Sequence, residues 1–71
     1  MNELIAELKK DGFSVSIDKD LEKGEGSLVA YLEATIIDQR IKDKYINRFM
    51  TNNYNEDGVE NFAVRLDYKL H

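Results

Sequence analysis

Near the amino terminus, hydrophobic residues recur at the spacing of one helix face. They are Met1, Leu4, Ile5 and Leu8. We expect an amphipathic helix over Asn2–Lys10, with Asn2 capping its first turn through the side-chain oxygen. Gly12 can adopt the positive φ that ends a helix, and Lys9 and Lys10 suit the negative end of the helix dipole. These signals agree on a short first helix.

Two segments with alternating hydrophobic and polar residues come next, a pattern typical of strands buried on one face. The first covers 13–17 and the second 27–37, and the charged segment 18–26 between them is predicted to be an exposed loop. In the second segment one alternate set is apolar throughout: Leu28, Ala30, Leu32, Ala34 and Ile36. The other set is mixed and comprises Val29, Tyr31, Glu33, Thr35 and Ile37. We predict two antiparallel strands joined by the loop.

Residues 38–52 fit two interpretations. Hydrophobic residues stand at helical spacing there, namely Ile41, Tyr45, Ile46, Phe49 and Met50. We favour a helix capped by Asp38, while a strand that follows a turn at Asp38 and Gln39 stays open. The next segment, 51–58, reads TNNYNEDG and has the chemistry of a turn. Alternation then returns over 62–70 and predicts a last strand.

The predicted fold is a single small α+β domain over residues 1–71, built in two layers. A three-stranded, mainly antiparallel sheet carries two helices on one face in the order α-β-β-α-β; the strand interpretation of 38–52 gives α-β-β-β-β instead. The expected core comprises Ile5, Leu8, Val15, Leu32, Phe49, Val64 and Leu66. The face without helices is too apolar for a bare surface, which indicates a protein partner or self-association. The candidate partner-binding residues are Val29, Tyr31, Thr35 and Ile37.

Composition narrows the class of protein. Hydrophobic residues make up 42% and charged residues 34% of the chain, as in folded soluble domains. Cysteine is absent, so neither disulfides nor thiolate metal sites support the fold. Residues 1–8 lack a signal-peptide pattern and the longest apolar run is 28–32, so we expect a cytoplasmic protein that does not span a membrane.

No catalytic constellation is present in the sequence. The single histidine is His71 at the end of the chain, where a side chain lacks an orienting partner. There is no G-x-S-x-G motif and no glycine-rich phosphate loop, so we expect neither an enzyme nor a cofactor site. The acidic run that starts at Asp18 departs from a calcium loop, because Lys23 stands where that loop needs glycine and Val29 where it needs glutamate. We therefore expect no metal site.

The net charge of −4 is unevenly spread and leaves two further functions open. Arg40, Lys44 and Arg48 form a basic stripe on the predicted second helix, which would bind nucleic acid weakly and only if its charges are unpaired. Acidic residues could instead imitate the phosphates of DNA and inhibit a nucleic-acid enzyme, if the two acidic loops lie close together. The residues concerned are Asp18, Asp20, Glu22, Glu25, Glu56, Asp57 and Glu60. Ahead of both we favour a non-enzymatic module or regulator that binds another protein.

One pattern at the start of the chain combines an acidic loop with the preceding residues Met1, Asn2, Leu4, Ile5, Glu7, Lys10 and Val15. It resembles the start of small acidic phage-encoded inhibitors of the RNA-guided CRISPR nucleases. The resemblance implies the inhibitor function above and an origin in a phage or mobile element. It does not extend to the carboxyl-terminal part, which is helical in those inhibitors and is predicted to be a strand here. We assign no family on this pattern and carry over no functional residue.

Overall fold

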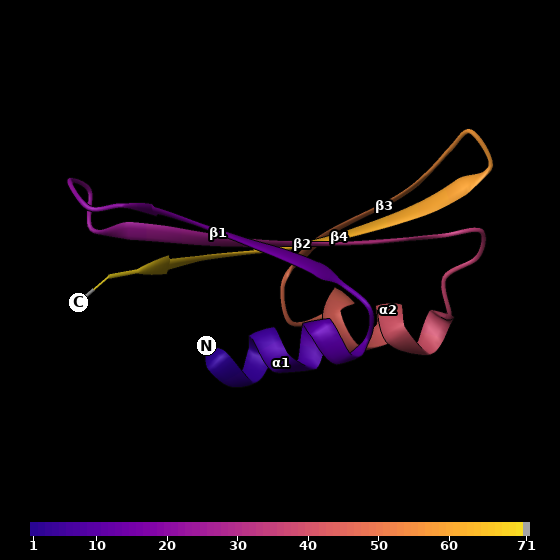
Figure 1. The fold of residues 1–71 in the computed structure, drawn as a ribbon, viewed down its shortest axis with the longest axis horizontal. Coiled ribbons are helices and arrows are strands. Elements are labelled where there is room, and N and C mark those ends of the chain that lie inside the picture. Colours follow the sequence, from indigo (N-terminus) through magenta and orange to yellow (C-terminus); the bar gives the residue numbers. More distant parts are fainter. Residues whose placement is uncertain (71) are drawn as a thin grey trace.

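The computed structural model describes residues 1–70, and its elements form two layers (Figure 1). In chain order they are α1 (Asn2–Lys10), β1 (Ser14–Asp20), β2 (Glu25–Ala34), α2 (Gln39–Ile46), β3 (Met50–Glu56) and β4 (Val59–Lys69). The four strands form one antiparallel sheet in the order β1-β2-β4-β3, and both helices lie on the same side of it. The α+β class and the placement of the helices are confirmed, whereas the favoured order α-β-β-α-β lacks the fourth strand.

Helix α1 has the bounds that the sequence predicts. Gly12 has a φ of 98°, a conformation that favours glycine, and the chain turns there into β1. The expected capping role of Asn2 is wrong, because Met1 occupies the capping position and no side chain hydrogen-bonds to the first turn. Leu8 on the inner face of α1 is completely buried, so the helix is held by packing rather than by a cap.

The first hairpin is tighter than the predicted loop over 18–26. Strand β1 continues to Asp20, which pairs with Glu25, so only residues 21–24 form the turn. Gly24 closes it with a φ of 64°. Most of the charged residues of this segment therefore lie on paired strands, where the sheet fixes their direction.

Strand β2 ends at Ala34, earlier than predicted, opposite the point where β4 begins to pair at Glu60. The Glu60 carboxylate accepts a hydrogen bond from the backbone N–H of Ile37 at 2.7 Å, and this contact holds the chain after the strand against the core. Ile37 is only 4% exposed, whereas Ile36 is 82% exposed. The prediction that Ile37 lies on the face without helices is therefore wrong.

The segment 38–52 is divided between a helix and a strand. Asp38 caps α2 as predicted, because its carboxylate accepts the backbone N–H of Arg40 at 2.9 Å. The helix ends at Ile46, so the helix interpretation is correct only for the first part of the segment.

Strand β3 begins at Met50 and overturns most of the turn predicted over 51–58. It pairs with β4 along its whole length, and that hydrogen-bonded ladder outweighs the low strand propensity of its asparagines. The turn is confined to Asp57 and Gly58, which both have positive φ as in the tightest hairpins.

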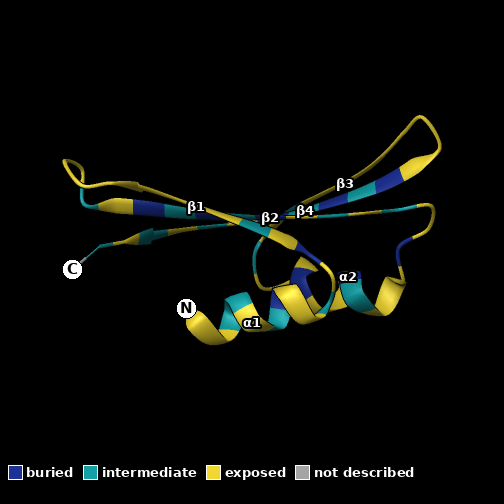
Figure 2. Cartoon of the chain, in the orientation of Figure 1, coloured by how far each residue is buried: buried dark blue, intermediate teal, exposed yellow. Residues whose placement is uncertain are grey.

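The core lies between the helices and the sheet, as the buried residues in Figure 2 show. It consists of Leu8, Phe13, Leu28, Ala30, Ile37, Tyr45, Phe62 and Val64. Phe13 packs edge-on against Tyr45 and Phe62, with ring centroids 5.3 and 6.2 Å apart. Leu8 and Val64 are fully buried as expected, and the other expected core residues, namely Ile5, Val15, Leu32, Phe49 and Leu66, pack against the core while remaining partly exposed. The prediction that Leu32, Val64 and Leu66 face the core is thus confirmed.

The molecule is elongated, with principal extents of 40 × 24 × 19 Å. Its radius of gyration is 13.0 Å, compared with about 11 Å for a compact domain of this length. The sheet extends past the helices at both ends (Figure 1). Part of the sheet is therefore left without a covering layer.

Candidate protein-binding face

The side of the sheet opposite the helices is a continuous surface, which we call the open face. The strand register and the alternation of side chains place on it Ser14, Ser16, Asp18, Asp20, Glu25, Ser27, Val29, Tyr31, Glu33, Met50, Asn52, Tyr54, Asn61, Ala63, Arg65, Asp67 and Lys69. No helix or loop of residues 1–70 lies across it (Figure 1). Four paired strands support this surface, so its side chains stand on a rigid backbone.

Large apolar side chains gather in the middle of the open face. Tyr31 is 52% exposed, Met50 58% and Tyr54 43%. Val29 and Met50 both lie opposite Arg65 from the two sides of β4. These residues surround a shallow hollow of about 350 Å³. We call the group formed by Val29, Tyr31, Met50, Tyr54 and Ala63 the open-face patch.

The structure brings together only half of the predicted partner-binding set. Val29 and Tyr31 both belong to the open-face patch. Thr35 is exposed, but it lies in the bend that follows β2, beyond the paired part of the strand. Ile37 is in the core. The sequence prediction missed Met50 and Tyr54, although the Asp-Gly turn that follows them is itself a signal for a hairpin.

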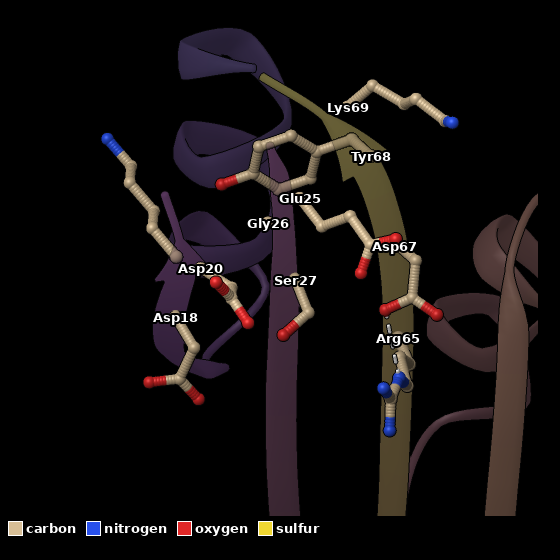
Figure 3. Close-up of a pocket in the computed structure, with 10 residues that line it drawn as sticks. Asp18, Asp20, Glu25, Gly26, Ser27, Arg65, Asp67, Tyr68 and Lys69 are labelled. Carbon is tan, nitrogen blue, oxygen red and sulfur yellow. Dashed lines mark hydrogen bonds and ion pairs between the residues drawn. The ribbon is translucent and has the colours of Figure 1, made fainter. Parts of the chain in front are cut away.

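A second hollow lies beside the patch, at the end of the open face near the β1–β2 turn. It measures about 440 Å³ and is lined by the carboxylates of Asp18, Asp20, Glu25 and Asp67, with Ser27 between them (Figure 3). We call this group the acidic end. Arg65 lines both hollows and donates a hydrogen bond to Asp67 at 3.1 Å, whereas the side chain of Lys69 extends away from the carboxylates. The patch and the acidic end are thus adjacent parts of one surface.

Every member of the basic stripe on α2 and its end is paired with a carboxylate. Arg40 contacts Asp38 at 2.8 Å, Lys44 contacts Asp11 at 3.1 Å and Arg48 contacts Glu7 at 3.2 Å. The Arg48 guanidinium also lies 5.1 Å from the centre of the Phe49 ring. The condition for phosphate binding, that these charges be unpaired, is not met.

The two acidic loops do not come together. Glu25 lies opposite Lys69 and Ala34 lies opposite Glu60, so the β1–β2 turn and the β3–β4 turn are at opposite ends of the sheet (Figure 1). Glu60 is also buried and therefore cannot contribute to an acidic surface. The arrangement needed to imitate a row of phosphates is absent from residues 1–70.

Glu60 is instead the centre of a buried polar cluster that attaches α2 to the sheet. Its carboxylate accepts hydrogen bonds from Lys42 Nζ at 2.6 Å, from the backbone N–H of Ile37 at 2.7 Å and from Asn53 Nδ2 at 2.9 Å. The hydrogen bond from Lys42, followed by those from Ile37 and Asn53, lowers the pKa of Glu60 to about 2. The carboxylate stays ionised at neutral pH and serves the fold.

Tyr45 and Asp11 connect the helices in a similar way. The Tyr45 hydroxyl donates a hydrogen bond to Asp11 Oδ2 at 2.7 Å, and Lys44 contacts the same carboxylate. The bond from Tyr45, followed by that from Lys44, lowers the pKa of Asp11 in spite of burial. Burial and the bond to Asp11 raise the pKa of Tyr45, so the phenol stays protonated and acts as a donor.

Two further observations concern other kinds of site. Among residues 1–70, no group of three or more His, Cys, Asp or Glu side chains is placed to hold a metal ion. The same residues form no helix of the length and apolar character that crossing a membrane requires. His71 lies outside the described residues.

Comparison with known proteins adds no relative to this picture. No protein-family model, no curated protein and no solved structure matches the chain.

Proposed function

We propose that the chain is a non-enzymatic module that binds another protein through the open-face patch and acts as a small regulator in the cytoplasm. The observation that carries this proposal is the exposure of Tyr31, Met50 and Tyr54 together on the uncovered face of a rigid sheet. Aromatic residues, methionine and arginine are enriched in protein interfaces, and Arg65 lies beside this group. Residues of this kind contribute most of the binding energy when a partner excludes water from them.

The size of the uncovered surface supports the same proposal. The accessible surface is 5167 Å², compared with about 4,500 Å² for a compact monomer of this mass. The excess is close to the roughly 800 Å² that each partner contributes to a standard interface. One partner on the open face would bring the exposed surface to that of a compact domain.

The other two functions have less support. The basic stripe is neutralised by Asp38, Asp11 and Glu7, which argues against a role in nucleic-acid binding. An inhibitor that imitates DNA needs a longer acidic row than the acidic end provides, because the two acidic turns lie at opposite ends of the sheet.

The test replaces the exposed apolar side chains while keeping strand propensity, in a Tyr31→Thr and Met50→Thr double variant. The matched control is Leu21→Thr with Ile36→Thr, since both of these residues are 82% exposed and lie off the patch. Each protein is immobilised, and the proteins that it retains from a lysate of the encoding cell are quantified by mass spectrometry. Retained partners are then purified and titrated by calorimetry.

About half of the surface of Tyr31 and of Met50 remains to be buried by a partner. Each should therefore contribute about 1 kcal/mol, so that the double variant binds about 30-fold more weakly. The control variant should bind as the unmodified protein does. A partner that binds the double variant and the unmodified protein equally well would exclude the open-face patch as its binding site.

A further inference from the structure

We infer that the partner is a different protein with a basic surface, whose lysine and arginine side chains contact the acidic end while an apolar group occupies the open-face patch. This inference rests on the proposed function and adds the chemistry of the partner. It is carried by the placement of the acidic end beside the patch on one rigid surface.

The charges of the helix side cancel within the molecule. Glu7, Asp11 and Asp38 each form an ion pair with a basic residue. Glu60 does the same with Lys42 in the interior. The other charged residues of α1 and α2 are Glu3, Lys9, Lys10 and Asp43, two acids and two bases whose charges sum to zero.

The open face has the opposite character. Asp18, Asp20 and Glu25 form no ion pair within residues 1–70, and the ion pair of Arg65 with Asp67 is the single one recorded on this face. The hollow of the acidic end is lined by four carboxylates and by three bases, Lys19, Arg65 and Lys69, so negative charge is in excess there. The residues placed on the open face comprise five acids and two bases, so most of the net charge of −4 lies on the side that carries the open-face patch.

The geometry sets the spacing that the partner needs. Val29 of the patch and Glu25 of the acidic end belong to the same strand, β2, and both point to the open face. Four residues of an extended strand span about 13 Å. A partner segment that places an apolar side chain on the patch would bring a lysine or arginine about 13 Å further on to the carboxylates.

A second copy of this chain fits the surface less well. Its own open face presents the same carboxylates, so a pair of copies joined through this face would bring two negative surfaces together. Like charges placed opposite each other destabilise an interface and select against that partner. A basic partner turns the same charges into attraction and into faster association.

The experiment uses three short synthetic peptides of block design. The first has an apolar half rich in leucine and a half rich in lysine, the second replaces every lysine by glutamate, and the third replaces every leucine by serine. Binding to the full chain is measured by fluorescence anisotropy over a range of ionic strength. We expect the leucine–lysine peptide to bind most tightly and to weaken as salt is added.

Two charge variants of the protein locate the contact. Asp18→Asn with Asp20→Asn removes two charges from the acidic end and keeps the side-chain oxygen with which Asp20 accepts the N–H of Lys23. Glu3→Gln with Asp57→Asn changes the net charge by the same amount on α1 and at the β3–β4 turn. The first variant should bind the leucine–lysine peptide about 3- to 10-fold more weakly, and the second should bind it normally.

Each outcome decides between the inference and the proposed function. Equal binding of the leucine–glutamate peptide, or equal effects of the two charge variants, overturns the inference and leaves the proposed function standing. Equal binding of the serine–lysine peptide, with no effect of Tyr31→Thr and Met50→Thr, overturns the proposed function as well. Failure of all three peptides to bind at millimolar concentration overturns the inference. Sedimentation as a dimer that the Tyr31→Thr and Met50→Thr variant dissociates also overturns it, because a second copy then occupies the face.

Discussion

Replacing Tyr45 by phenylalanine tests how the two helices are held together. The Tyr45 side chain is completely buried, and its hydroxyl donates a 2.7 Å hydrogen bond to the carboxylate of Asp11. Tyr45→Phe keeps the ring and its packing against Phe13, so it removes this bond and little else.

The stability lost with this hydrogen bond depends on the partners that Asp11 keeps. A hydrogen bond to a charged group is worth about 1.5–3 kcal/mol. Asp11 keeps its contacts with Lys44 at 3.1 Å, so its carboxylate is not left without a donor and the lower half of that range applies. A domain of this length has a free energy of unfolding of roughly 4–11 kcal/mol. At about 4–8 °C per kcal/mol for a domain of this size, Tyr45→Phe should lower the melting temperature by about 6–18 °C.

The matched control is the same substitution at Tyr54, where the hydroxyl forms no hydrogen bond recorded within residues 1–70. Melting of the unmodified protein, Tyr45→Phe and Tyr54→Phe is followed by circular dichroism, and the carboxyl of Asp11 is titrated by NMR. We expect Tyr54→Phe to melt with the unmodified protein. In Tyr45→Phe the pKa of Asp11 should rise towards its ordinary value, because the phenol is the largest cause of its lowering. An unchanged melting temperature together with an unchanged Asp11 titration would refute the assigned role of the bond.

Three other predictions concern the sheet and its attachment to α2. Leu28→Ala, at a fully buried position, should lower the free energy of unfolding in urea by about 2–5 kcal/mol. Glu60→Gln should lower the melting temperature at neutral pH. The pKa of Glu60 in the fold is about 2, below its ordinary 4.5, so the ionised carboxylate stabilises the folded protein fully above pH 4.5. The difference in melting temperature between the two proteins should therefore shrink as the pH falls from 4.5 to 2. Gly26→Ala would place a methyl group 2.5 Å from the Tyr68 ring, so it should destabilise the protein. In a double-mutant cycle, the destabilisation by Gly26→Ala should be smaller when Tyr68→Ala is also present.

Local patterns are sufficient to predict several elements of this fold. The apolar face of α1, the cap at Asp38 and the register of β4 each depend on residues close together in the chain, and each is confirmed. Strand β3 is different, because its Asn52, Asn53 and Asn55 have low strand propensity and pair only because β4 lies beside them. Alternation within the segment does not show that partner, and the Asp57-Gly58 turn after it is the local signal for the hairpin.

The residues of the candidate site also fall into two groups, those placed by local alternation and those placed by contacts between distant parts of the chain. Alternation within β2 predicts the placement of Val29 and Tyr31 on the open face, whereas Met50 and Tyr54 join the patch through the pairing of β3 with β4. Ile37 was misplaced because its position is set by Glu60, a residue 23 positions away that accepts its backbone N–H. Buried polar contacts between distant residues carry no periodic signal.

The distribution of charge links the stability of the molecule to its proposed role. Three ion pairs join α2 or the residues that follow it to other parts of the fold, namely Lys42–Glu60, Lys44–Asp11 and Arg48–Glu7. The basic residues of these pairs hold the helix layer in place. The chain has 14 acidic and 10 basic residues, and Asp18, Asp20 and Glu25 of β1 and β2 form no ion pair within residues 1–70. The ion pairs that hold a small sheet to its two helices thus lie on one side of it, and the excess of acidic residues lies on the other side, beside an apolar patch that a basic partner would cover.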